Sequence, residues 1–209
     1  DNTISPVAII REDTQVSQLT ERCKHNIDAI VLAGGQAKRM QGRDKGLVPF
    51  RGKPLIEHVL ARISPQVDRI VISANRNQVD YRHFGFEVVS DRRPDFQGPL
   101  AGIEACAAFC TAEFTLITAC DTPLLPSDLT QRLLLTLADQ SCEASYADDG
   151  DRQHYLCALV RTAALASVSD YLDRKQRSVH GWLSLLNAKA SYFADCTEAF
   201  HNLNRDADT

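Results

Sequence analysis

The chain has 209 residues, with 23 Lys and Arg against 27 Asp and Glu, and a formal net charge of −4. That length suits one sizeable α/β core and is short for two independent ones. The mildly acidic balance argues against a protein whose whole surface lies on nucleic acid or on an anionic membrane. We therefore expect a single domain over residues 26–209, preceded by an N-terminal extension over residues 1–25 with no assigned role.

The cysteine pattern and the lack of long apolar runs indicate the compartment. The seven cysteines are odd in number and show neither CxxC nor Cys/His zinc spacing. Reduced, mostly buried thiols are therefore expected rather than a disulfide framework or a zinc site. No apolar run approaches the roughly 18 residues of a membrane span, and the first residues lack the apolar core of a signal peptide. We expect a cytoplasmic protein with no membrane and no nucleic-acid partner.

Short apolar strands alternate with amphipathic helices in the first two thirds of the chain. The β-branched run at 29–32 predicts a buried strand, and residues 54–63 predict a helix with proline in its first turn. Further strands are predicted at 69–73, 86–89 and 114–118, and further helices at 102–110 and 127–137. This alternation indicates a three-layer α/β/α fold with a mostly parallel, doubly wound sheet.

The last third of the chain is less regular. Strands are predicted at 144–147 and 155–160, on either side of the polar turn 148–152, as in a hairpin. We therefore expect an antiparallel edge on the sheet. Helices are predicted at 162–172 and 179–186, and a late strand includes residues 192–193.

A glycine turn followed by cations, between Leu32 and Gly46, is the strongest functional signal. Gly34 and Gly35 come directly after the first strand, where exposed backbone N–H groups bind anions well. The cations that follow are Lys38, Arg39, Arg43, Lys45, Arg51 and Lys53, against the single acid Asp44. Such a local excess of positive charge in an acidic chain predicts a site for a triphosphate.

Two familiar phosphate motifs do not fit this turn. The chain has no GxGxxG and no GxxxxGK[ST], and Ser73-Ala74-Asn75 stands where a dinucleotide-binding fold places an acid. Rossmann dehydrogenases and P-loop NTPases are therefore disfavoured. A plain tight turn with solvated charges is the simpler alternative, but six cations beside the glycines count against it.

Two further strand ends carry residues suited to ligand binding. Asp121 follows the strand at 114–118, so it should face the same crevice as the glycine turn, where its carboxylate could hold Mg²⁺ on phosphate oxygens. The alternative is that Asp121 only caps the turn that follows it. Asp91 follows another strand and could accept hydrogen bonds from a base or sugar, although it is as readily a turn residue. Gly98 and Gly102 permit close approach of a ligand.

These motifs together resemble the molybdenum cofactor guanylyltransferases, over roughly residues 27–204. The resemblance is carried by LAGGQAKRMQGRDKG at 32–46, GPLAG at 98–102, CDTP at 120–123 and NLN at 202–204. Gln41 stands where that family usually has glycine, and Gly42 follows it. The resemblance implies an Mg²⁺-dependent enzyme that transfers GMP from GTP to molybdopterin, working with proteins that deliver or receive the cofactor.

The resemblance also implies roles for individual residues. Nucleotide contacts are expected from Leu32, Ala33, Gly34, Gly35, Lys45, Asn75, Asp91 and Asp121. Catalytic roles are expected for Lys45, Arg39 and Asp121, with Asp121 as the metal ligand. Pterin contacts are expected from Gly98, Gly102, His154, Arg177, Asn202 and Asn204. The pterin half departs more from the family pattern, since Tyr155 stands where proline is frequent.

Three alternatives stay open at the level of sequence. The enzyme could use CTP on the same cofactor or an NTP on a sugar phosphate, or the chain could be a non-catalytic nucleotide-binding module that delivers the cofactor. The double glycine at 34–35 favours GTP over CTP. The presence of Lys45 together with Asp121 favours an enzyme over a delivery module.

Overall fold

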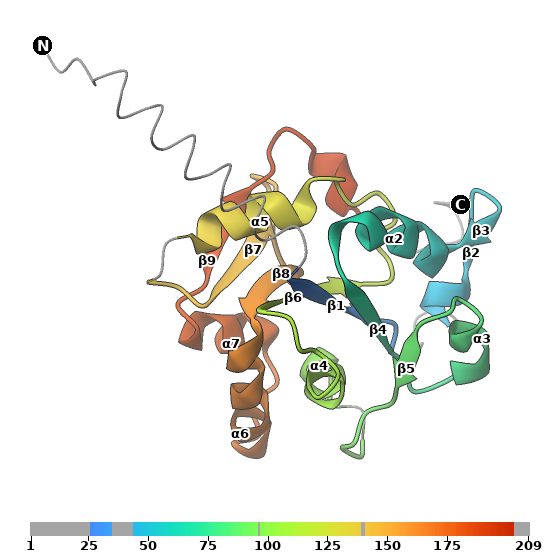
Figure 1. Cartoon of the computed structure of the whole chain (residues 1–209), viewed down its shortest axis with the longest axis horizontal. Helices are drawn as coiled ribbons and strands as arrows, with labels where there is room; N and C mark the ends of the chain where they lie inside the picture. Colours follow the sequence, from blue (N-terminus) through green and yellow to red (C-terminus); the bar gives the residue numbers. More distant parts are fainter. Residues whose placement is uncertain (1–25, 35–43, 96, 139–140, 203–209) are drawn as a thin grey trace, which may run out of the picture.

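The computed structural model describes residues 26–34, 44–95, 97–138 and 141–202, so the predicted extension over 1–25 lies outside the described residues. A seven-stranded sheet in the order β5-β4-β1-β6-β8-β7-β9 forms the middle layer (Figure 1). Its strands are β1 (Ile27–Leu32), β4 (Arg69–Ser73), β5 (Glu87–Val89), β6 (Phe114–Ala119), β7 (Ala144–Asp148), β8 (Gln153–Arg161) and β9 (Lys189–Tyr192).

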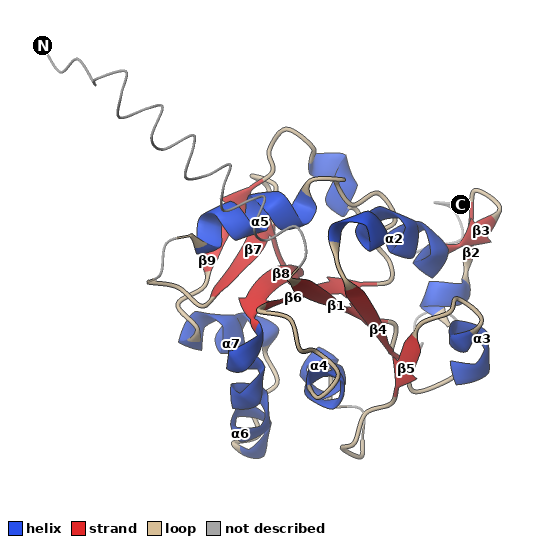
Figure 2. Ribbon diagram, in the orientation of Figure 1, coloured by secondary structure: helices blue, strands red, loops and turns tan. Residues whose placement is uncertain are grey.

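Helices cover both faces of this sheet (Figure 2). One face carries α2 (Leu55–Ile63) and α5 (Leu129–Leu137), and the other carries α4 (Pro99–Ala107), α6 (Ser167–Asp173) and α7 (Val179–Leu185). The central strand β1 is buried along its whole length: Val31 packs in the core under α2, and Ile30 packs in the core under α4. The predicted three-layer α/β/α fold is therefore confirmed.

The order of the strands places a crevice at the carboxyl end of β1. The chain adds β4 and then β5 on one side of β1, and afterwards returns to place β6 on the other side. The strand order thus reverses between β1 and β6, whose carboxyl ends are neighbours because Leu32 pairs with Ala119. In open α/β sheets ligands bind outside the carboxyl ends of the strands at such a reversal.

The antiparallel pairs lie in the predicted half of the sheet, but not at its edge. β8 runs against both β6 and β7, and it lies between them. The edge strand β9 pairs parallel with β7. The reason is burial: residues 157–160 of β8 are buried, so the second arm of the hairpin enters the interior of the sheet and the chain returns to the edge later.

Several short elements were not predicted, because they are too short for a hydrophobic period to show. They are η1 (Lys45–Leu47), β2 (Pro49–Phe50), β3 (Lys53–Pro54), η2 (Ser64–Gln66), α3 (Gln78–Arg82) and η4 (Thr197–Phe200). The predicted helix at 162–172 is divided into η3 (Thr162–Ala166) and α6. Helix α4 begins at Pro99, earlier than predicted, because proline favours the first helical position after Gly98.

Gly102 lies where α4 packs closely on β1 and β4. A Cβ at this position would overlap Ser73 Oγ and lie 3.1 Å from Leu32 Cδ2. The absence of a side chain therefore sets the distance between the helix and the two strands that end at the crevice.

We expect Gly102→Ala to lower the free energy of unfolding by about 1–3 kcal/mol. The added methyl group overpacks this contact, and the free-energy cost of overpacking exceeds the gain in helix propensity from glycine to alanine. Urea denaturation measures the change. Ala108→Ser, at an exposed position at the end of the same helix, is the control and should leave stability unchanged. Equal stability of Gly102→Ala and the wild type would contradict close packing at this point.

Candidate functional site

Lys45 and Asp121 meet at the carboxyl edge of the sheet. Lys45 opens η1, after the glycine turn, and Asp121 follows β6, 76 positions later in the chain. The Lys45 ammonium group donates a hydrogen bond to Asp121 Oδ2. The side chains are 26% and 13% exposed, so water screens this ion pair less than it would at a fully open surface.

The second oxygen of Asp121 is oriented differently. Asp121 Oδ1 is buried and has no hydrogen-bond partner among the described residues. The carboxylate therefore does not cap the turn that follows it, which was the alternative at the sequence level. A buried acceptor oxygen without a donor is the kind of atom that a cation would satisfy.

The donor set at this edge suits a magnesium ion that is shared with phosphates. Within the described ranges there is no group of three or more His, Cys, Asp or Glu side chains that could hold a metal by themselves. Mg²⁺ is usually bound through one or two carboxylates plus substrate phosphates, and it keeps several waters. Asp121 Oδ1 fits that pattern as the protein's ligand.

Asn75 and Asp91 join the ends of β4 and β5. Asn75 Nδ2 donates to Asp91 Oδ2 at 2.8 Å, and Asp91 N donates to Asn75 Oδ1 at 2.8 Å. Burial raises the pKa of Asp91, while the hydrogen bond from Asn75 works in the opposite direction. Gly34 lies beside this pair, since a Cβ there would lie 3.3 Å from Asn75 Nδ2. These three predicted nucleotide residues are therefore neighbours.

The remaining predicted nucleotide residues divide into two groups. Leu32 and Ala33 are buried, and their backbone groups are engaged: Leu32 O accepts from Cys120 N at 3.1 Å, and Ala33 N donates to Ser73 O at 2.9 Å. They hold the strand ends together. Gly35 and Arg39 lie outside the described residues.

Two of the predicted pterin residues are engaged with other parts of the protein. His154 Nε2 lies 2.7 Å from Asp149 Oδ2, and the imidazole stacks on Phe200 with ring centroids 4.9 Å apart. The Arg177 guanidinium donates to Leu172 O at 2.8 Å and so caps α6. These contacts order the region around the start of β8 and the end of α6.

The other predicted pterin residues lie in different settings. Gly102 is buried within α4, on the side that packs against β1 and β4, so it shapes packing rather than an open surface. Gly98 is exposed and has φ +84°, a left-handed backbone that glycine adopts readily, at the N-cap of α4. Asn202 is exposed at the end of the described chain, and Asn204 lies outside the described residues.

Sequence reasoning missed the side chains behind Lys45. Asp44 is the single acid among the cations of this segment. It accepts hydrogen bonds from Tyr81 in α3 and from Asn77, which immediately precedes α3. Its place next to Lys45 was the available signal. The partners could not be read from the sequence, because α3 is too short to show a helical period.

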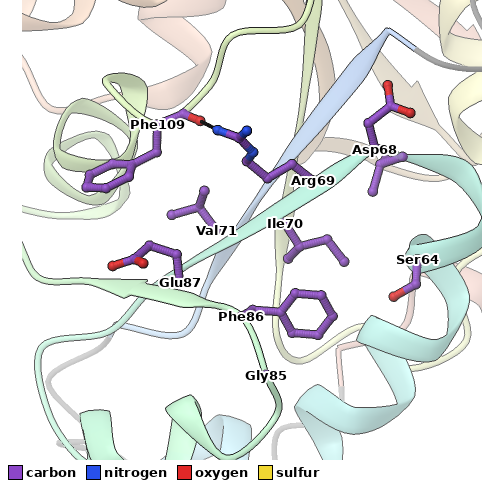
Figure 3. Close-up of a pocket in the computed structure, with 10 residues that line it drawn as sticks. Ser64, Asp68, Arg69, Ile70, Val71, Gly85, Phe86, Glu87 and Phe109 are labelled. Carbon is purple, nitrogen blue, oxygen red and sulfur yellow. Dashed lines mark hydrogen bonds between the residues drawn. The ribbon is translucent and has the colours of Figure 1, made fainter.

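A separate pocket opens near the amino end of β4 (Figure 3). Arg69, whose Nη1 donates to Phe109 O at 3.1 Å, lies on one side of it, and Phe86 lies on the other. The pocket is thus at the end of the strand opposite to Lys45 and Asp121. Ligands of open α/β sheets bind at the carboxyl ends, so we assign this pocket no part in the site.

No disulfide joins the six cysteines of the described residues, and five of them are buried. Burial raises the pKa of the Cys110 thiol to about 11. No helix in the described part of the chain is long and apolar enough to span a bilayer.

A family model and the curated relatives of this chain point to the same family. Residues 29–188 match the family described as MobA-like NTP transferase domain. A molybdenum cofactor guanylyltransferase from Shewanella halifaxensis is 42% identical over 178 residues, which cover 85% of this chain and 89% of that protein. One from Shewanella sp. strain MR-4 is 43% identical over 178 residues, covering 85% and 90%.

Solved structures share the fold. Molybdopterin-guanine dinucleotide biosynthesis protein A from Archaeoglobus fulgidus superposes with a TM-score of 0.70 at 23% identity, covering 87% of this chain and 94% of that one. A 4-diphosphocytidyl-2C-methyl-D-erythritol synthase from Anaerococcus prevotii superposes with a TM-score of 0.69 at 12% identity, covering 91% and 95%. These two likenesses show that the fold is shared with both proteins.

The Asp149 carboxylate predicts a pH effect on stability. Burial raises its pKa, but the hydrogen bonds from His154 and from the Arg152 and Asp151 amides outweigh burial and leave the pKa below its usual value. A lowered pKa in the folded state stabilises the fold above the unfolded pKa of about 4, and this stabilisation is lost as the pH falls. We expect Asp149→Asn to lose less stability than the wild type between pH 5 and 3 in urea titrations. Parallel pH profiles of the two proteins would contradict this.

Proposed function

Because the chain belongs to the MobA-like NTP transferases and, within them, to the molybdenum cofactor guanylyltransferases, we propose that it transfers GMP from GTP to molybdopterin. The observation that carries the site is the Lys45–Asp121 pair, in which one carboxylate oxygen faces the lysine and the other is buried without a partner. The pair lies at the strand-order reversal between β1 and β6, where such sheets bind ligands.

The reaction needs positioning and charge neutralisation rather than a covalent nucleophile on the protein. A terminal phosphate oxygen of molybdopterin attacks the α-phosphorus of GTP in line. A new P–O bond forms while the bond from the α-phosphorus to the bridging oxygen breaks, and pyrophosphate leaves with the electron pair. Lys45, held at the crevice, would offset the negative charge that develops on the triphosphate.

Asp121 is the proposed metal ligand, through its buried Oδ1. Mg²⁺ bound there would neutralise phosphate charge and act as a Lewis acid. The contribution of this chain is to present one oxygen to the ion while Lys45 is paired with the other. In this way a single carboxylate orders two positive charges at one end of the sheet.

The rest of the nucleotide site is proposed around the glycine turn. Gly34 lies against Asn75, and Asn75 is hydrogen-bonded to Asp91, so a nucleoside placed over Gly34 would lie near amide and carboxylate groups that can bind it. Gly35 and Arg39 are proposed to contact the phosphates. We propose that Leu32 and Ala33 shape the turn, since their side chains are buried.

For the acceptor, we propose contacts from one group of residues beyond Asp121: Gly98, His154, Arg177, Asn202 and Asn204. Gly102 would act indirectly, by setting how closely α4 and the loop before it lie to β1 and β4. We also propose that the enzyme works in the cytoplasm with proteins that deliver or receive the cofactor. The six described cysteines form no disulfide, which supports a reducing compartment.

The function is tested by pyrophosphate release. We expect the protein to release pyrophosphate from GTP only when molybdopterin and Mg²⁺ are present, and to form the guanine dinucleotide of the pterin. CTP should give far less product. Product from CTP or from a sugar phosphate, with none from GTP and molybdopterin, would favour one of the other nucleotidyltransferases. Nucleotide binding without transfer would favour the delivery module.

In that assay we expect Asp121→Ala to abolish transfer and leave the fold intact, because it removes the proposed metal ligand. Asp128→Ala is the matched control, since Asp128 is an exposed aspartate before α5, and it should keep full activity. Circular dichroism verifies that both variants fold. Near-normal turnover by Asp121→Ala would remove Asp121 from the metal site.

Lys45→Ala should cost on the order of 2–4 kcal/mol of transition-state stabilisation, about 10²–10³ in kcat, by analogy with the loss of one oxyanion donor. Lys189→Ala is the matched control, because Lys189 lies in the edge strand β9, where its ammonium group donates to Ser141 Oγ at 3.1 Å. It should stay within about twofold of the wild type, because an exposed polar contact away from the site contributes little. Equal rates for the two variants would contradict the role of Lys45.

A further inference from the structure

Asp44, the residue before Lys45, is held by two side chains of one short segment. Tyr81 Oη donates to Asp44 Oδ1 at 2.5 Å, and Asn77 Nδ2 donates to Asp44 Oδ2 at 3.2 Å. Tyr81 lies in α3 and Asn77 immediately precedes it. Both oxygens of the carboxylate thus have a donor from the segment that follows β4.

The two donors are themselves fixed in place. Tyr81 is fully buried in the core under α2. Burial and the nearby Cys120 and Asp44 raise the pKa of its hydroxyl, which therefore stays protonated and able to donate. Asn77 has φ +48°, a left-handed conformation that asparagine tolerates better than most residues.

Gly46, on the other side of Lys45, is confined by the same tyrosine. A Cβ on Gly46 would lie 2.5 Å from Tyr81 Oη and 3.2 Å from Cys120 Sγ. Cys120 directly precedes Asp121. The backbone that carries Lys45 therefore lies between the tyrosine hydroxyl and the strand end that carries the aspartate, and Asp44 and Gly46 restrain it on both sides.

We propose that Tyr81 is a positioning residue for nucleotidyl transfer: through Asp44 and Gly46 it sets where the Lys45 ammonium lies relative to Asp121. This inference rests on the proposed function. Tyr81 does not reach the substrate, since it is fully buried and its hydroxyl is occupied by Asp44. Its effect passes through Lys45, so it should change the rate of transfer more than the binding of nucleotide.

The first test is Tyr81→Phe, which keeps the ring and removes the hydroxyl. We expect kcat to fall about 10- to 100-fold, the size of effect that a misplaced catalytic group produces, while KM for GTP changes less than about threefold. Tyr171→Phe is the control, because Tyr171 is buried on the opposite face of the sheet. An unchanged kcat in Tyr81→Phe would overturn the proposal.

A second variant tests the other donor. Asn77→Gly removes the amide but keeps a residue that accepts the positive φ. We expect a smaller fall in kcat than for Tyr81→Phe, because this hydrogen bond is longer and exposed. A rise in KM for GTP alone, with kcat intact in both variants, would overturn the proposal, since the hydrogen bonds from Tyr81 and Asn77 to Asp44 would then serve nucleotide binding.

A double-mutant cycle separates positioning from a general structural effect. If Tyr81 acts only through Lys45, then Tyr81→Phe should cost nothing further in a Lys45→Ala background, because residues that act as a unit are not additive. Full additivity of the two losses would overturn the proposal.

A measurement without substrate keeps the two proposals apart. Lysine acylation followed by mass spectrometry should label Lys45 several-fold faster in Tyr81→Phe than in the wild type, with Lys53 unchanged as an internal standard. Faster labelling of Lys45 would support the role of Tyr81 in holding Lys45 in place. This result would stand even if the wild type forms no guanine dinucleotide, an outcome that would refute only the proposed function. Equal labelling of Lys45 in the two proteins would refute the positioning role of Tyr81.

Discussion

The arrangement of the candidate site depends on one half-buried ion pair at the carboxyl edge of the sheet, between Lys45 and Asp121. Opposite charges attract strongly only where water is partly excluded, and that condition requires the ends of β1 and β6 to lie side by side. The pair satisfies one oxygen of Asp121 and leaves the other buried without a partner. It is this unsatisfied oxygen that the proposed cation would bind, next to the lysine proposed to face the phosphates.

The surrounding elements serve to keep these two side chains in place. Leu32 O accepts from Cys120 N, which ties the loop after β6 to the end of β1. Tyr81 holds Asp44 and limits Gly46, so the turn that carries Lys45 has little freedom. Each of these contacts joins residues that are distant in the chain.

The two halves of the proposed site are organised differently. On the nucleotide side, Gly34 is exposed and the hydrogen-bonded pair of Asn75 and Asp91 lies beside it, which suits a preformed binding surface. On the acceptor side, His154 and Arg177 already bond to Asp149 and to backbone carbonyls. These bonds order the start of β8 and the end of α6, whereas Gly98 and Asn202 are exposed.

The strand–helix alternation, the glycine turn after the first strand and the position of Asp121 at a strand end could all be predicted from the sequence, because hydrophobic period and turn residues are local properties. The sequence also carried the family resemblance, which the relatives confirm. Four features became apparent only in the folded protein: Lys45 pairs with Asp121, β8 is internal, Gly102 serves helix packing and Tyr81 supports Asp44. The physical reason is that these contacts join residues distant in the chain, and they depend on strand order and burial, which no local pattern encodes.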